Sequence, residues 1–510
     1  MYMLKLSFIL LFLGFVKFSW QEEQVPKVST FAGNIRGYYK KSRHDRLYEA
    51  YEGIPYAQSP VGKFRFQPPR PIKKWSKDLL ATKKSSVCMQ YLMTFTTHGN
   101  RVKGSEDCLY INIYVPVRNN RKPLLPVMFW IHGGAFQFAS GNEANETFLM
   151  DRNIVFVAIN YRLGPFGFLS TGDIIVPGNM GLKDQRGISI SGVAFCPWAQ
   201  TKHAPEKAKK LGALMKCRTD DTKKMIDCLQ SRPARNIAQA VGDFMFWLYN
   251  PFAPFGPVVE TYGSNPFISN SPINIINNGQ AYDVPWISGV VSKEGLYTAA
   301  EFIGNAKLLR HLNDHWDDIA PYLLDFNNTI PLDQHKQVAE KIKNYYLGSG
   351  PINFDKVGSI IQMMSDRLFN IDFEKAVRLQ ARINKSPVWI YYYSYRAKHS
   401  VSEILSGGST ANYGVSHGDD IFLTLDSIIS NVTKPQDLTM QQLLINFYTS
   451  FAIQGIPRID EATWPSLNPN DPDFRYLHIV NVTNIKMKVN NNFANKNFWK
   501  TIPFNENKLN

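Results

Sequence analysis

An apolar run from Pro126 to Ile131 ends abruptly in His132-Gly133-Gly134. Continuous apolar runs of this length are typical of a buried strand that is covered on both faces. The glycines that follow let the backbone turn so that its N–H groups point into a cavity, and donors held in that way stabilise an oxyanion. An ordinary Gly-Gly turn has the same local sequence, so the rest of the chain has to decide between the two interpretations.

A second apolar run, Ile154 to Asn160, predicts another buried strand, and strands then alternate with helical patterns to the end of the chain. This alternation predicts an α/β fold with a mostly parallel sheet. The expected strands are Phe31–Tyr39, Arg46–Tyr51, Val127–Ile131, Ile154–Asn160, Pro285–Val291 and Val388–Tyr395, and the expected helices are Ala204–Met215, Lys223–Gln230, Leu332–Tyr346, Val357–Asn384 and Met440–Ile453.

The chain has 510 residues, of which 44% are hydrophobic, so it can bury a large core as one elaborated unit. Its net charge of +15 is spread along the sequence, and the densest run, Lys202 to Lys210, is interleaved as on a solvated helix. Nucleic-acid binding would need a clustered basic stripe, so no nucleic-acid partner is expected. The chain has neither a CxxC pair nor an HExxH motif, and we therefore expect no metal site and no cofactor.

The N-terminus has the outline of a secretory signal peptide, predicted to be residues 1–20. A short basic region, Met1 to Lys5, precedes an apolar run from Leu6 to Val16 that is too short to span a bilayer, although a signal anchor is an alternative. No other stretch is apolar enough to cross a membrane. Four sequons agree with a secreted, extracellular glycoprotein: Asn145, Asn327, Asn431 and Asn481.

Five cysteines are present. In an oxidising compartment the natural pairs are local, Cys88 with Cys108 and Cys217 with Cys228. Each disulfide would close a short loop and contribute ~3 kcal/mol to stability in the chain-entropy model. Cys196 remains unpaired, and we interpret it as a buried thiol because no base lies beside it in sequence.

Several further motifs occur in a fixed order. They are Gly53-Ile54-Pro55-Tyr56-Ala57, Glu106-Asp107-Cys108-Leu109-Tyr110, His132-Gly133-Gly134, Asn160-Tyr161-Arg162-Leu163, Gly178-Asn179-Met180-Gly181-Leu182, Asp184-Gln185, Glu294-Gly295 and His417. With these motifs the chain resembles the type-B carboxylesterase family, which includes cholinesterases, insect esterases and the non-catalytic neuroligins. Its pattern is closest to that of secreted insect esterases.

The resemblance implies an α/β-hydrolase fold over residues 25–505 and a small apolar ester as the ligand. It makes Gly133 and Gly134 the oxyanion-hole glycines, Glu294 the triad acid and His417 the triad base, and it implies the same two disulfides. Glu294 precedes His417, as the order serine, acid, histidine requires. Alone, Glu294 would be interpreted as a surface carboxylate and His417 as a turn residue; the ordered motif set favours the catalytic roles.

The nucleophilic serine of that triad is missing. It should lie in a G-x-S-x-G elbow after Gln185, between a buried strand and a helix. The chain instead continues from Gln185 directly to Arg186-Gly187-Ile188-Ser189-Ile190-Ser191-Gly192, which resembles the strand that follows the elbow. Elements of ordinary length would add ~40–50 residues at this junction. Neither Ser189 nor Ser191 has a small residue on both sides, as the strained turn requires.

Loss of the elbow strand also has a structural consequence. Unpaired backbone groups inside the sheet would cost ~1–3 kcal/mol each. We therefore expect either a sheet that closes with a changed register or a chain that does not fold stably.

Two interpretations of function remain open. The chain is an internally truncated form of an active carboxylic-ester hydrolase, from a skipped exon or a wrongly predicted gene, and is inactive or strongly impaired. Alternatively, it is a non-catalytic binding or adhesion protein of the neuroligin type. The intact base, acid and oxyanion loop favour the first. The sequence leaves juvenile-hormone-like, lipid and xenobiotic esters open as ligands.

Overall fold

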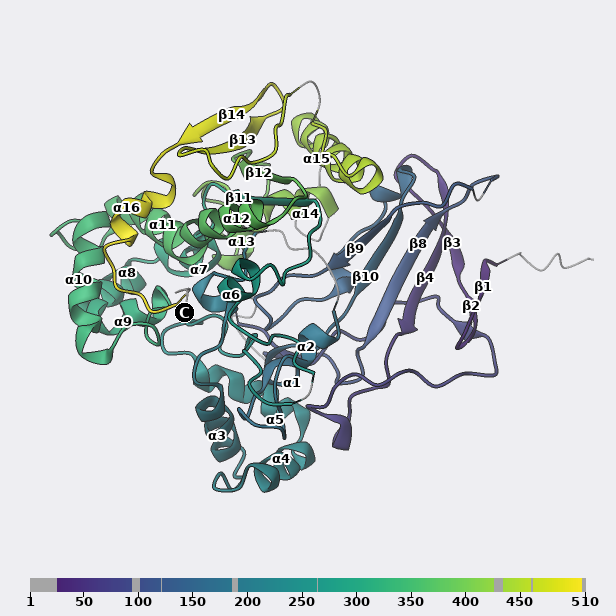
Figure 1. Ribbon diagram of the computed structural model, residues 1–510, viewed down its shortest axis with the longest axis horizontal. Coiled ribbons are helices and arrows are strands. Elements are labelled where there is room, and N and C mark those ends of the chain that lie inside the picture. Colours follow the sequence, from purple (N-terminus) through teal and green to yellow (C-terminus); the bar gives the residue numbers. More distant parts are fainter. Residues whose placement is uncertain are drawn as a thin grey trace, which may run out of the picture.

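The computed structural model describes residues 25–93, 101–120, 122–185, 191–263, 265–425, 434–459 and 462–506. The predicted signal peptide, Ser189 and the sequon at Asn431 lie outside these ranges. Figure 1 shows the N-terminal strands on one side of the molecule, most helices on the other, and the C-terminal strands above them.

The strands form two main sheets and two small ones. The N-terminal sheet has the order β3-β4-β8-β10-β9, and the C-terminal sheet has the order β11-β12-β13-β14. Their bounds are β3 Tyr38–Lys41, β4 Leu47–Pro55, β8 Tyr110–Pro116, β9 Val127–Ile131, β10 Val155–Ile159, β11 Trp286–Val291, β12 Val388–Tyr393, β13 Phe474–Asn481 and β14 Asn484–Asn490; the small sheets contain β1 Lys27–Thr30, β2 Gly33–Arg36 and β5 Leu79–Leu80, and β6 Gln90–Tyr91 and β7 Val102–Lys103.

The parallel strand pairs lie toward the β9 edge of the N-terminal sheet and toward the β11 edge of the C-terminal sheet. Strand β9 is parallel to β10, and β12 is parallel to both β11 and β13, whereas the remaining pairs of these two sheets are antiparallel. In the described part of the chain no strand joins β9 to β11. The two sheets have therefore not closed up through a new β9–β11 pairing.

Helices cover the C-terminal sheet on both faces. Met440, Leu444 and Phe447 of α15 pack on the side of the sheet that carries Tyr391 and Leu477. The helices are α1 Gly164–Phe168, α2 Met180–Lys183, α3 Ala204–Leu214, α4 Thr222–Ser231, α5 Ala234–Gln239, α6 Pro272–Asn277, α7 Leu296–Ile303, α8 Ala306–Asp314, α9 Trp316–Leu323, α10 His335–Tyr346, α11 Val357–Ser365, α12 Ile371–Ile383, α13 Val401–Leu405, α14 Asp419–Leu425, α15 Pro435–Gln454 and α16 Lys496–Trp499.

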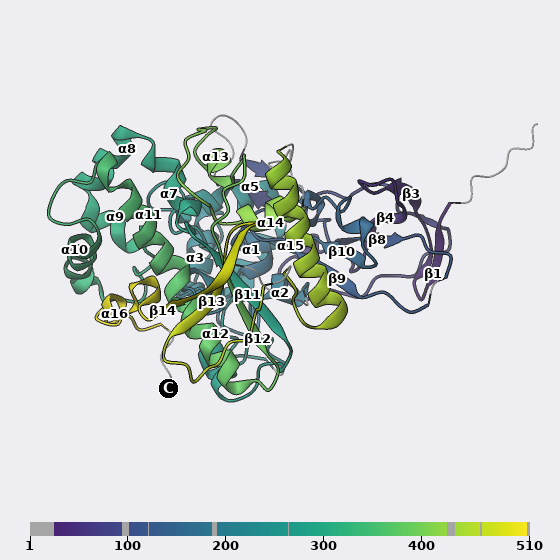
Figure 2. The same cartoon turned by 90° about the horizontal axis from the view of Figure 1, so that it is seen from above.

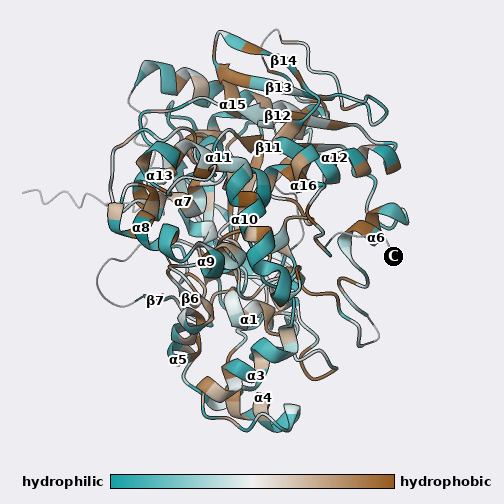
Figure 3. Ribbon diagram, turned by 90° about the vertical axis from the view of Figure 1, so that its left-hand side faces the viewer, coloured by the Kyte–Doolittle hydropathy of each residue, from teal (hydrophilic) through white to brown (hydrophobic). Residues whose placement is uncertain are grey.

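The other face of this sheet packs against α12 through Phe373 and Val377, which contact the cluster around Ile390. Helix α15 also reaches the N-terminal sheet, because its Ile445 packs in the cluster of Tyr114 and Phe156. In Figure 2 α15 lies between the two sheets, and in Figure 3 α8, α9 and α10 cover the side that faces the viewer. None of the described helices is long and apolar enough to cross a bilayer.

Burial of the opening apolar run differs from expectation. Residues 127–131 form a strand as predicted, but Val127 is 58% exposed and Phe129 is 40% exposed. Strand β10, by contrast, is buried along most of its length. The prediction that the first run is covered on both faces is wrong, because β9 is the last strand of its sheet and has a described neighbour on one side alone.

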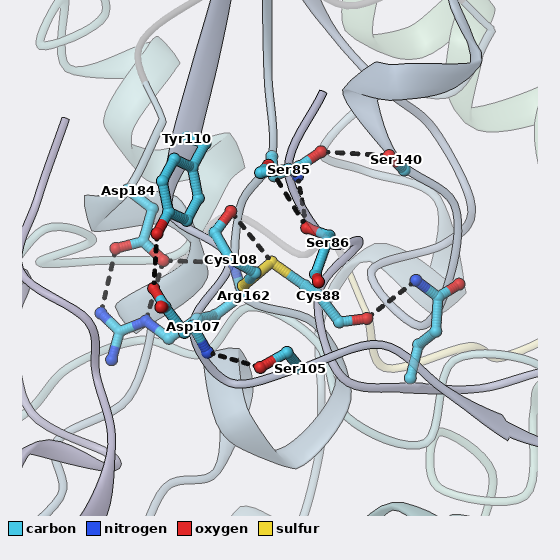
Figure 4. Close-up of a disulfide and its surroundings, with 12 residues drawn as sticks. Ser85, Ser86, Cys88, Ser105, Asp107, Cys108, Tyr110, Ser140, Arg162 and Asp184 are labelled. Atoms are coloured by element: carbon cyan, nitrogen blue, oxygen red, sulfur yellow. Dashed lines mark hydrogen bonds and ion pairs between the residues drawn. A yellow bond between two sulfur atoms is a disulfide. The ribbon is translucent and has the colours of Figure 1, made fainter. Parts of the chain in front are cut away.

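Buried charges are paired close to the first disulfide. Arg162 donates two hydrogen bonds to Asp184, from Nε and Nη2, at 2.9 and 3.0 Å, and a third to the Gln67 carbonyl at 2.6 Å. Figure 4 shows this pair beside the Cys88–Cys108 disulfide. Arg65 is also buried, and its Nε donates to Glu106 Oε1 at 2.5 Å.

We expect Asp184→Asn to destabilise the protein by about 3–5 kcal/mol, because the substitution leaves Arg162 buried without a counter-charge. The side chains of both residues are at most 3% exposed. A fall in the midpoint of urea unfolding measures this effect. The control is Asp220→Asn, which removes the solvent-exposed partner of Arg218 and should not move the midpoint. Equal behaviour of the two variants would contradict the assignment.

Candidate active site

Glu294 and His417 meet as the sequence predicts. The ring Nδ1 of His417 donates to Glu294 Oε2 at 2.6 Å, and the Glu294 side chain is completely buried. Glu294 follows β11, and His417 lies in the loop before α14. The two loops are held together by the backbone, because Lys293 N–H donates to the Val415 carbonyl at 3.0 Å. The acid therefore fixes the tautomer that leaves Nε2 of His417 as the basic nitrogen.

Two opposing effects set the protonation of His417. Burial, the largest single effect, lowers the pKa of this imidazole, but the charge and hydrogen bond of Glu294 and the charges of Asp420 and Asp419 together raise it above 6.5. His132 has no such partner, and burial lowers its pKa to about 4 despite a hydrogen bond to the Gly133 carbonyl. His417 is therefore the histidine suited to proton transfer at neutral pH.

The loop after β9 presents backbone donors. The N–H groups of Gly133 and Gly134 donate to no carbonyl or side chain in the described ranges. Gly134 has φ +101°, and a Cβ there would lie 2.1 Å from the Phe138 carbonyl oxygen, so no other residue fits. Ala135 and Phe136 also have positive φ, at 50° and 65°. Strained backbone with free donors is the arrangement expected of an oxyanion hole.

Aromatic rings connect this loop to the base. The Phe136 ring lies 6.3 Å from Trp198, Trp198 lies 5.6 Å from Phe369, and Phe369 lies 5.0 Å from His417. A second path runs from Trp198 through Phe252 and Tyr297 to His417, with successive centroids 5.6, 5.2 and 5.2 Å apart. We call these rings, together with His417, the aromatic cage. Apart from His417, no sequence motif pointed to these rings, because the six members come from six separate segments.

Ser191 contacts the acid and not the base. Its hydroxyl donates to Glu294 Oε1 at 3.1 Å. In the part of the chain that the structure describes, no hydroxyl or thiol hydrogen-bonds to Nε2 of His417. The prediction treated Ser191 solely as a poor substitute nucleophile and missed this contact. A serine on the acid side of the pair cannot transfer its proton to the nitrogen that would act as the base.

The other predicted sites have different outcomes. The disulfides Cys88–Cys108 and Cys217–Cys228 are both formed, and Cys196 is a buried free thiol whose pKa burial raises well above 9.0. The described ranges contain no cluster of histidine, cysteine and carboxylate side chains that could hold a metal.

Three of the four sequons can be placed. The side-chain oxygens of Asn145 and Asn481 accept hydrogen bonds from Thr147 and Thr483, the third residues of their sequons. Asn327 differs, because its Oδ1 is buried without a partner and Thr329 is 4% exposed. All three asparagines are partly exposed.

Comparison with known proteins identifies the family. The carboxylesterase family model matches residues 24–187 and 185–499. The chain belongs to the carboxylesterase family. The two matched parts meet at the Gln185–Arg186 junction, where the sequence predicts a deletion.

Relatives are insect esterases. Venom carboxylesterase-6 of Apis mellifera is 85% identical over 557 positions that cover 100% of each chain, and a carboxylic ester hydrolase of Bombus ignitus is 58% identical over 548 positions that cover 98% of each. The solved structure of juvenile hormone esterase from Manduca sexta aligns with a TM-score of 0.78 at 22% identity, covering 94% of this chain and 99% of that one. The α/β-hydrolase fold predicted from the sequence is thereby confirmed.

Replacing Glu294 by Gln should lower the pKa of His417, because the largest of the effects that oppose burial is removed and only the weaker charges of Asp420 and Asp419 remain. A histidine titration followed by NMR measures the shift. In the unmodified protein His417 is protonated more readily in the folded than in the unfolded chain. Its contribution to stability is therefore complete below pH 6.5 and is lost as the pH rises through the folded pKa. Glu294→Gln should weaken this dependence of stability on pH.

The matched control is Glu403→Gln. Glu403 pairs in the same way with another ring, His399 Nδ1, at 3.0 Å. The Glu403→Gln substitution should leave the pKa of His417 unchanged. If the pKa of His417 moves equally in both variants, the direct contact with Glu294 is excluded as the cause of the shift.

Proposed function

We propose that this chain is a carboxylesterase-family protein that has lost its nucleophile and therefore does not hydrolyse esters through an acyl-enzyme. The observation that carries the proposal is the isolation of the base: Nε2 of His417 has no hydroxyl partner in the described ranges, and Ser191 is bound to Glu294. The activity of the intact site would be hydrolysis of carboxylic esters by a Ser-Glu-His triad.

The length of the relatives supports a deletion. The alignment with the Apis mellifera protein runs over 557 positions, against 510 residues in this chain, and covers the whole of both. The excess falls within the ~40–50 residues that a strand, the elbow and its helices would occupy. The break between β9 and β11 lies at the place in the sheet where such a strand belongs.

Orphaned polar atoms next to the junction support it independently. Nε2 of His132, Oε1 of Gln137 and Nε2 of Gln185 are buried without a hydrogen-bond partner in the described part of the protein. Buried polar groups are normally paired, so each such atom requires an explanation. All three belong to the oxyanion loop or to the residue before the junction; unpartnered buried atoms also occur far from it, at Arg378 and His478 for example.

The remaining groups would still bind an ester. Free N–H donors at Gly133 and Gly134 suit a carbonyl or carboxylate oxygen, and the aromatic cage suits an apolar acyl or alcohol group. We infer a small apolar ester as the ligand. A pseudoenzyme that arose by gradual change would keep its scaffold and lose single residues. This chain instead keeps Glu294, His417 and the oxyanion loop, while a whole segment of the scaffold is inferred to be lost. This combination favours truncation of an active esterase over a neuroligin-type adhesion protein.

We expect the chain to take no label from a fluorophosphonate probe and to release no alcohol from aryl esters. Insertion, between Gln185 and Arg186, of the segment that the Apis mellifera relative has there should restore both. The control is the same insertion with its elbow serine changed to alanine, which should remain unlabelled. A labelled serine peptide from the uninserted chain would falsify the proposal.

We further propose that the protein is secreted and glycosylated. Two formed disulfides and accessible sequons at Asn145 and Asn481 support an oxidising, extracellular destination. Expression in insect cells should place the protein in the medium with a glycosidase-sensitive mobility. Asn481→Gln, at the turn between β13 and β14, should remove one step of that shift. Protein that stays in the cells without any glycan would refute this destination.

A further inference from the structure

Most of the net charge of the protein comes from two short segments. Residues 53–77 contain six Lys and Arg residues and no Asp or Glu, and residues 202–235 contain ten Lys and Arg residues against four Asp and Glu. Together they supply +12 of the net charge of +15. These segments are more than a hundred residues apart, and for that reason the sequence suggested a thinly spread charge.

The fold brings the two segments into contact. Arg65 Nη1 donates to the carbonyls of Leu229 and Arg232 at 2.8 and 2.7 Å, and Gln230 Nε2 donates to the carbonyls of Lys63 and Arg65 at 3.2 and 3.0 Å. The end of α4 is thus fixed against the turn at Gly62–Phe64. In Figure 1 α3 and α4 project together from the lower side of the molecule.

Four basic side chains lie along this contact. Arg70 lies over the Phe64 ring at 4.2 Å and Lys63 lies over the same ring at 5.4 Å. Arg232 donates to the Lys216 carbonyl at 3.3 Å, and the adjacent Cys217–Cys228 disulfide holds that corner of the α3–α4 hairpin. We call Lys63, Arg70, Lys216 and Arg232 the basic rim.

The basic rim is not neutralised by nearby acids. The four Asp and Glu residues of the hairpin include Asp220, Asp221 and Asp227, which pair with Arg218, Lys224 and Lys223 on the outer part of the hairpin. Within the described residues, none of the four rim side chains forms an ion pair. The exposed lysines of the two segments that extend this charge, also without a described acidic partner, are Lys73, Lys74, Lys77, Lys209 and Lys210.

We propose that the basic rim binds a linear sulfated polysaccharide. The unpaired cations lie on two segments that are hydrogen-bonded to each other, one of them closed by the Cys217–Cys228 disulfide. Such a set of cations fits a chain of regularly spaced anions, whose counter-ions are released on binding. An anionic bilayer is the poorer match, because surface binding to lipid combines cations with exposed aromatic or apolar anchors. Phe64 is covered by its two cations, the α3–α4 hairpin contains no aromatic residue, and the large exposed apolar side chains of the two segments are limited to Val61 and Leu214. A sulfated polysaccharide also agrees with the extracellular destination proposed above, on which this inference rests.

Immobilised heparin tests the proposal with the full-length protein. We expect the salt concentration needed for elution to fall clearly for the variant K63Q/R70Q/K216Q/R232Q, with a loss of at least about tenfold in affinity at fixed ionic strength. The matched control, K398Q/K486Q/K488Q/K500Q, removes the same charge from exposed lysines elsewhere and should elute like the unmodified protein.

Each outcome decides the question. Equal shifts for the two variants would mean that net charge alone causes retention, and the proposal would fail. Stronger binding to phosphatidylserine vesicles or to duplex DNA than to heparin, abolished by the same variant, would also overturn it. The double variant K63Q/K216Q changes exposed lysines alone and replaces the quadruple variant if thermal unfolding shows that the latter is unstable. Secretion tested separately keeps failure of this inference distinct from failure of the proposed destination.

Discussion

A completely buried carboxylate, Glu294, holds together three segments that are distant in sequence. Its Oε1 accepts from Ser191 Oγ at 3.1 Å and from the Val291 N–H at 2.8 Å, and its Oε2 accepts from His417 at 2.6 Å. A buried charge is tolerated when it is paired and hydrogen-bonded in this way. The same contacts join the segment at Ser191, the end of β11 and the loop of His417, so Glu294 and His417 are held in a fixed arrangement.

Helix packing holds the two main sheets together, although no strand joins β9 to β11 in the described part of the chain. Helix α15 contacts the cores of both main sheets, through Ile445 on one side and Leu444 on the other. Strand β9 lies at the open edge of its sheet, and its apolar residues Val127 and Phe129 are partly exposed there. Exposed apolar strand edges favour association with other chains. The structure therefore combines an assembled acid–base pair with a scaffold that is open beside it.

Much of the fold and half of the site were predictable from sequence. Apolar patterns located the strands β9, β10, β11 and β12 and the longest helices, α10, α12 and α15, but missed β13, β14 and many short helices. The ordered motifs singled out Gly133, Gly134, Glu294 and His417, because each motif combines turn chemistry with a fixed position after a strand. Burial of β9 could not be predicted, since it depends on a neighbour that is absent. The role of Ser191 and the aromatic cage were missed because these contacts join residues with no regular spacing.

The sequence by itself determined the family, the disulfide pairs and the absence of a G-x-S-x-G motif, and it predicted that Glu294 and His417 are partners, since all of these follow from local residue order. Tertiary structure alone decided which groups meet. It directed the Ser191 hydroxyl to Glu294 and away from His417 Nε2, and it joined two basic segments into one rim. The physical reason is the same in both cases: hydrogen bonds and charges act over a few ångströms of space, whatever the separation along the chain.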